Sequence, residues 1–171
     1  CRDAPVIAAV WLRVGLIVPR ADFIAIWSQQ PTNTRTNLAK AMLDLQPDTA
    51  VRVLGPDALN ALLQERRDGA FHRLVGQGLI AYRVDGAERC LNVMLPELQI
   101  TFAPIFAEAA AASGADSIPD WFWKLTKPAQ ENALPRFAVQ AVAKDLSTAF
   151  TQALDHLTDA ACLELTVLLQ Q

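Results

Sequence analysis

Histidine and cysteine, the residue types that most often carry catalysis or bind transition metals, are few in this chain and lie far apart. No HExxH, GxSxG or paired-carboxylate spacing is present, and the short Gly76-Gln77-Gly78 segment lacks the third glycine of a phosphate-binding loop. None of the histidines and cysteines has a neighbour at metal-ligand spacing; they are His72, His156, Cys1, Cys90 and Cys162. We therefore predict that the protein is not an enzyme and uses neither a metal nor a cofactor.

The cysteines and the apolar segments bear on where the protein works. Widely spaced cysteines in odd number are typical of free thiols in a reducing compartment, which predicts a cytoplasmic protein. Cys1 leaves a second possibility open, an acylated cysteine that anchors a periplasmic domain to lipid. The most apolar run covers residues 6–18 and contains Arg13. A membrane-spanning helix needs about 20 apolar residues, so we predict a buried helix here and no membrane span.

Charge is distributed unevenly along a chain of ordinary globular composition. Hydrophobic residues make up 52% of the sequence and charged residues 19%, which excludes a disordered protein. Residues 1–95 contain eleven Lys and Arg against nine Asp and Glu, whereas residues 96–171 contain four against nine. This asymmetry favours a nucleic-acid-facing first half joined to a partner-facing second half.

The elements expected between residues 33 and 95 follow a recognisable order. Apolar residues at helical spacing predict a helix over 35–45, and the β-branched run 50–54 predicts a strand. Gly55-Pro56-Asp57 opens a second helix to residue 66, and a third covers 70–77 and ends at Gly78. Alternating runs on either side of Asp85-Gly86 predict a β-hairpin over 79–95.

This order of elements resembles the winged helix-turn-helix superfamily over about sixty residues. The run Gly78-Leu79-Ile80-Ala81-Tyr82-Arg83 is similar to the step from recognition helix to wing in bacterial regulators of that class. The resemblance implies a mainly α fold with a small antiparallel β hairpin (α+β). A winged-helix-like domain over 33–96 would be preceded by a helical segment over 1–32 and followed by a helical dimerisation or partner-binding region over 97–171.

The resemblance also implies contact with double-stranded DNA. In this superfamily the third helix enters the major groove, which here would present His72, Arg73 and Gln77 to base edges. Arginines near the turn and the wing would hold phosphates; they are Arg66, Arg67, Arg83 and Arg89. The same arginines lie beside acids with which they could form solvated ion pairs instead, and near-neutral winged helices also dock onto proteins.

Helices are expected on both sides of this domain. We predict them over 4–17 and 21–29, over 102–112 and over 119–125, and we expect one long helix from Pro135 to residue 169 with a bend near Thr158. In the long helix Val142, Leu146 and Phe150 recur at steps of four, as in a core-facing helix or a dimer seam. Three adjacent rings cannot all be buried by one short helix, so at least one is expected to be exposed or in contact with a partner, unless the long helix shields it; they are Trp121, Phe122 and Trp123.

Three functions follow from these patterns. The first is a bacterial-type winged-helix DNA-binding protein, either a transcriptional regulator or a replication or partition accessory factor. The second is a non-catalytic interaction subunit of a multiprotein assembly, with a homodimer or protein partner at the C-terminal helices. The third is a lipid-anchored periplasmic domain attached through Cys1.

Overall fold

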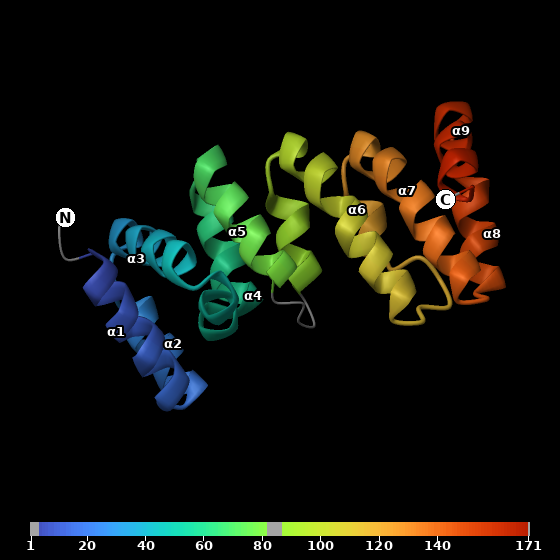
Figure 1. Ribbon diagram of the computed structural model, residues 1–171. Coiled ribbons are helices and arrows are strands. Elements are labelled where there is room, and N and C mark those ends of the chain that lie inside the picture. Colours follow the sequence, from blue (N-terminus) through green and yellow to red (C-terminus); the bar gives the residue numbers. More distant parts are fainter. Residues whose placement is uncertain (1–3, 82–86, 171) are drawn as a thin grey trace. The chain divides into compact units, whose positions relative to one another are not determined.

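The computed structural model describes residues 4–81 and 87–170, and every regular element in these ranges is a helix (Figure 1). The chain divides into two compact units, residues 1–95 and 96–171. Unit 1 contains α1 (Ala4–Ile17), α2 (Arg20–Ser28), α3 (Thr32–Leu45), α4 (Pro47–Glu65), α5 (Gly69–Ala81) and the 3-10 helix η1 (Ala87–Val93). Unit 2 contains α6 (Pro96–Ala112), the 3-10 helix η2 (Phe122–Lys124), α7 (Lys127–Ala143), α8 (Ser147–Asp155) and α9 (Asp159–Leu168).

The predicted α+β fold is wrong, because the described residues form no hairpin and no strand. Residues 79–81 continue α5, and residues 87–93 form η1. Cys90, Leu91 and Met94 are buried in η1 and just beyond it, at spacings of one and three that suit a helical turn. The alternation in the sequence was therefore compatible with a helix as well as a strand. The Asp85-Gly86 turn on which the hairpin was centred lies outside the described residues, as does Cys1.

The predicted strand over 50–54 is wrong as well, since these residues form the first part of α4. Ala50, Val51, Val53 and Leu54 are all buried, so the run covers a wide helix face against α3 and α5. A run of five residues with four apolar ones cannot by itself distinguish a strand from a buried helical turn. The helix start predicted at Pro56 is confirmed, because α4 is interrupted at Gly55, where φ is 74° and ψ is 167°.

The interruption in α4 is bridged by an arginine from α2. Pro56 has no N–H, so the carbonyl of Arg52 loses the donor that an uninterrupted helix would supply. The guanidinium of Arg20 donates to that oxygen at 3.1 Å and to the oxygen of Leu54 at 3.2 Å. A Cβ on Gly55 would overlap this guanidinium. Glycine is therefore needed at this position both to adopt the positive φ and to leave room for the Arg20 side chain. Arg20 thereby attaches the α1–α2 hairpin to α4.

Close approach of α5 to its neighbours depends on Gly78. This residue was predicted to end the helix in a left-handed conformation, which is wrong, because it lies inside α5 and has no positive φ. A Cβ at this position would lie 2.6 Å from Val51 Cγ2 and 2.9 Å from Leu43 Cδ2. Glycine is used here for packing, and α5 can approach α3 and α4 because no side chain intervenes.

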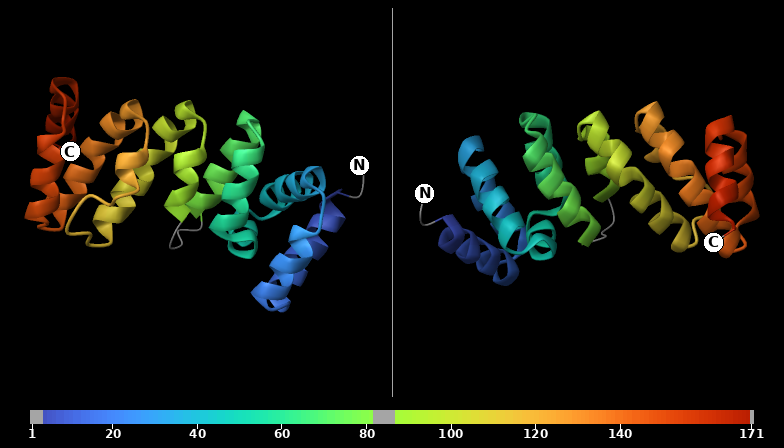
Figure 2. Two further views of the ribbon diagram at one scale, coloured as in Figure 1. Left: turned by 180° about the vertical axis from the view of Figure 1, so that it is seen from behind. Right: turned by 45° about the horizontal axis from the view of Figure 1, so that its top comes forward.

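Unit 2 is built around two long helices, α6 and α7, which lie side by side in both views of Figure 2. The single long helix predicted from Pro135 is wrong. Pro135 lies within α7, and the chain turns at Asp145, whose φ is 56°, before α8 begins at Ser147. α8 and α9 then pack on α7 as separate helices. No helix in the described part of the chain is long and apolar enough to cross a membrane.

Candidate interaction surface

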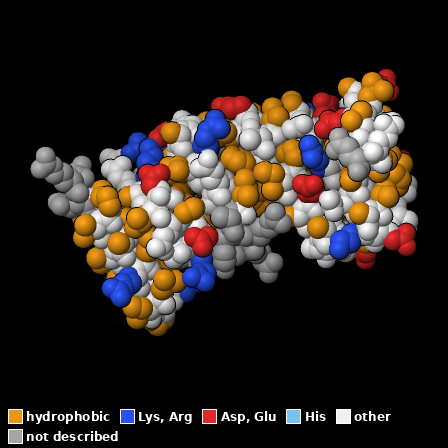
Figure 3. Space-filling view, in the orientation of Figure 1, with side chains coloured by type: hydrophobic (Ala, Val, Ile, Leu, Met, Phe, Trp, Pro, Cys, Tyr) orange, Lys and Arg blue, Asp and Glu red, His pale blue; other side chains and the backbone are white. Residues whose placement is uncertain are grey.

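The α1–α2 hairpin, residues 4–31, concentrates exposed apolar side chains on one part of unit 1. The described residues expose thirteen large hydrophobic side chains, and six belong to this hairpin; they are Val6, Ile7, Val10, Leu16, Ile17 and Ile26. Figure 3 shows hydrophobic side chains gathered over α1 and α2. Contiguous exposed apolar patches mark interaction sites more often than isolated exposed residues do.

An aromatic cluster joins the two helices of the hairpin. The ring of Trp11 lies 5.8 Å from that of Phe23 and 5.5 Å from that of Trp27, both edge to face. Phe23 and Trp27 are buried, whereas Trp11 is half-buried. Edge-to-face pairs at these separations add about 0.5–1.5 kcal/mol each beyond their buried area. The exposed apolar side chains are therefore presented on a preorganised surface.

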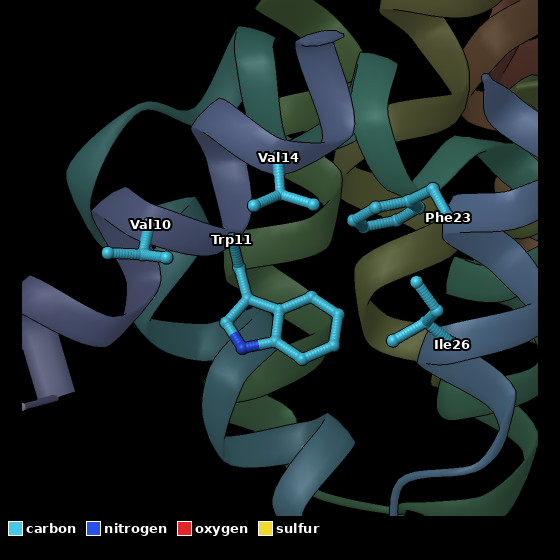
Figure 4. Close-up of a pocket in the computed structure, with 5 residues that line it drawn as sticks. All are labelled: Val10, Trp11, Val14, Phe23 and Ile26. Atoms are coloured by element: carbon cyan, nitrogen blue, oxygen red, sulfur yellow. The ribbon is translucent and has the colours of Figure 1, made fainter. Parts of the chain in front are cut away.

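A groove opens between the two helices on this surface. It has a volume of about 200 Å³ and is lined by Val10, Trp11, Val14, Phe23 and Ile26, with almost no polar surface. In Figure 4 the indole of Trp11 and the side chain of Val14 face Phe23 and Ile26 across it. An engineered apolar cavity of about 150 Å³ accepts benzene, so this groove has room for a large apolar side chain from a partner.

The helix α1 is apolar on nearly every side, although unit 1 covers only part of it. Ala8 and Leu12 are buried, and Gly15 fits so closely beneath Val53 that a Cβ there would overlap that side chain. On the other side Val6 is 66% exposed and Ile17 is 78% exposed. A helix that is hydrophobic all round is normally covered all round, so α1 has an apolar face left over after unit 1 has folded. The sequence indicated this apolar run but assigned it to the core.

The residues predicted to meet base edges do not share one exposed face. Arg73 and Gln77 are exposed on α5, but His72 is fully buried, so the prediction that it faces solvent is wrong. Its Nε2 donates to the carbonyl of Arg66, and its Nδ1 accepts the backbone N–H of Leu95 at 3.3 Å. This imidazole ties the start of α5 to the end of unit 1. A buried, doubly bonded ring cannot also reach a base.

The predicted phosphate contacts are dispersed and partly occupied. Arg66 donates to the side chain of Asn33, and Arg89 forms an ion pair with Asp57 at 3.1 Å. Arg67 is exposed beside the start of α5, and Arg83 lies outside the described residues. Ion pairing was the alternative left open by the sequence for these arginines, and Arg89 does form an ion pair. Its partner is Asp57, however, and not an acid next to it in the sequence.

The predicted partner-binding residues of unit 2 fall into two groups. Val142, Leu146 and Phe150 come together around a hollow of about 190 Å³ at the turn between α7 and α8, together with Asp145 and Ser147. Because this turn interrupts the helix, they cannot form the continuous seam that was predicted.

The three adjacent aromatic rings at η2 differ in exposure. Phe122 is buried, Trp121 is half-buried, and Trp123 remains 38% exposed. The ring of Trp123 lies 4.5 Å from the imidazole of His156, which covers one side of it. At least one exposed ring was expected from the sequence, and Trp123 is that ring.

Two titratable groups are perturbed by their surroundings. The ammonium of Lys40 bonds to the Asp68 carboxylate and holds the pKa of that carboxyl below its usual value, and the backbone N–H groups of Phe71 and Ala70 act in the same direction. Asp68 thus caps α5. Burial raises the pKa of the Cys90 thiol to about 12, which keeps it protonated and unreactive. No group of three or more His, Cys, Asp and Glu within 4–81 and 87–170 is placed to hold a metal ion.

Comparison of the chain with models of protein families, with curated proteins and with solved structures finds no match.

Proposed function

We propose that this chain is a non-catalytic protein-interaction module whose binding face is the α1–α2 hairpin. One observation carries the proposal: an apolar groove and the exposed apolar face of α1 lie together on the α1–α2 hairpin, on the part of it that the rest of unit 1 does not cover. The aromatic cluster beneath that face supports the same role, since a preordered surface loses less conformational entropy when it binds.

DNA binding is the weaker candidate. It depended on a recognition helix beside a β wing, and the wing is absent from the described residues. Of the seven residues assigned to DNA, His72 is buried, and Arg66 and Arg89 are bonded to Asn33 and Asp57. The widely spaced cysteines, with Cys90 and Cys162 both free, agree with a module that works in the cytoplasm.

A photo-crosslinking amino acid at position 10 tests the proposed face. Val10 is 55% exposed at the groove, so the substitution leaves the core intact. In cells that make the chain, we expect illumination to attach a protein covalently at this position. The matched control is position 37, because Asn37 is exposed on α3 and does not line the groove, so no protein adduct is expected there. Absence of a protein adduct at position 10, or equal adducts at both positions, would refute the proposed binding face.

A further inference from the structure

We infer that the occupant of the α1–α2 face is a second copy of this chain, bound through a two-fold symmetric contact. The inference rests on the proposed function, because it names the partner of that same face. The observation behind it is that the face is apolar and also carries one cation and one anion without ion-pair partners among the described residues, so that two copies of the face can pair their charges.

The apolar stripe of α1 contains one charge. Val6, Val10, Arg13 and Ile17 recur at steps of three and four, so their side chains lie along one side of the helix. Arg13 is exposed, and no ion pair joins it to any acid in the described part of the chain. An unpaired guanidinium in the middle of an apolar stripe needs an acid from the surface that covers it.

The other helix of the hairpin supplies such an acid. Asp22 precedes Ile26 by four residues, so it lies on the side of α2 that borders the groove. It is exposed and likewise has no ion-pair partner among residues 4–81 and 87–170. Arg20, the third charged residue of the hairpin, is bonded to carbonyls of α4. Of the exposed charged residues of the hairpin, Arg13 and Asp22 are therefore the two that are not already bonded to another helix of unit 1.

A two-fold axis converts this pair into a reciprocal contact. In a symmetric interface, residue i of one copy meets residue j of the other, and j meets i. When the α1 helices of two copies pack against each other, Arg13 of each copy faces the groove edge where Asp22 of the other lies. Ile17, the most exposed large hydrophobic residue of the hairpin, then covers apolar surface of the partner. The single two-fold contact therefore forms two Arg13–Asp22 ion pairs and covers the apolar face of each copy.

The test is a charge-swap cycle on the intact chain, read by sedimentation velocity over a range of concentrations. The unmodified chain is expected to sediment as a dimer, at twice 18.7 kDa for these 171 residues. Arg13→Glu and Asp22→Arg each place like charges together and should raise the dimer dissociation constant about tenfold or more. The double variant R13E/D22R restores opposite charges and should return the constant to within a few-fold of the original.

Controls separate this interface from general surface effects. Ile17→Asp should give a monomer, whereas Leu163→Asp on α9, where the leucine is 72% exposed, should leave the dimer unchanged. A chain that is monomeric at every concentration, or a double variant no better than the two single ones, refutes the second copy. If the crosslink at position 10 then joins a protein of another mass, the interaction module stands and the self-association does not. If nothing is crosslinked, both fail.

Discussion

Replacement of Gly55 by alanine tests how the break in α4 holds the α1–α2 hairpin in place. The backbone at Gly55, with φ 74° and ψ 167°, is a region that only glycine enters readily, and forcing another residue there costs about 1–3 kcal/mol. The new Cβ would also displace the Arg20 guanidinium from the carbonyls of Arg52 and Leu54. Hydrogen bonds to charged groups contribute about 1.5–3 kcal/mol each, and an exposed arginine belongs at the low end.

Together these losses predict that Gly55→Ala lowers the free energy of unfolding of unit 1 by about 4–6 kcal/mol. The measurement is hydrogen exchange of the α4 amides, because a chain of two units need not unfold in one step. Arg20→Ala provides the matched background. The three atoms nearest the added Cβ all belong to Arg20, so in that background Gly55→Ala should cost only the backbone strain. Equal costs in both backgrounds, or no cost at all, would refute the bridging role of Arg20.

Three further outcomes are expected within the same chain. Gly78→Ala should lower the stability of unit 1 in a urea titration by about 1 kcal/mol, because overpacking outweighs the gain in helix propensity. The control in the same titration is Gly69→Ala. The nearest atom to a new Cβ there is 3.6 Å away, so no overpacking loss is expected. The lowered pKa of Asp68 means that its charge stabilises the fold above the usual aspartate pKa, and this contribution is lost as the pH falls through the lower folded value. The advantage of the natural chain over Asp68→Asn should therefore be present at neutral pH and disappear in acid, and a constant difference would contradict it. Alkylation of the folded chain at pH 8, read by peptide mass, should modify Cys162 and spare Cys90 until the chain is unfolded.

The helices that could be predicted are those with a long 3.6-residue pattern and a proline or glycine at their ends. The helix expected over 4–17 coincides with α1, and the one over 21–29 differs from α2 by one residue at each end. Pro19 separates them, since it fixes its own backbone and disfavours helix before it. Gly55 was likewise informative, because the proline after it lacks a helical N–H and glycine readily adopts the non-helical backbone seen there.

The two predicted strand regions could not be recognised as helical from the sequence, because a short apolar run fits the two-residue period of a strand and the 3.6-residue period of a helix equally well. In residues 50–54 the branched residues Val51 and Val53 alternate, yet Ala50 and Leu54 are buried too, and only the neighbouring α3 and α5 decide that all four are covered. His72 shows the same limit. Its burial depends on the carbonyl of Arg66 and the N–H of Leu95, one six and the other twenty-three residues away. Such partners are set by tertiary packing and not by local pattern.

The interaction surface was missed for a different reason, because an apolar residue in a sequence does not say whether its own chain or another chain covers it. The run over 6–18 was assigned to the core, and α1 does place Ala8 and Leu12 there. Arg13 is the residue that distinguishes the two cases. Buried within one chain without an acid beside it, a guanidinium would be strongly destabilising, whereas at an interface it selects a partner that brings a carboxylate to it. The position of Arg13 within an otherwise apolar helix therefore supports the proposal that α1 is shared between two molecules.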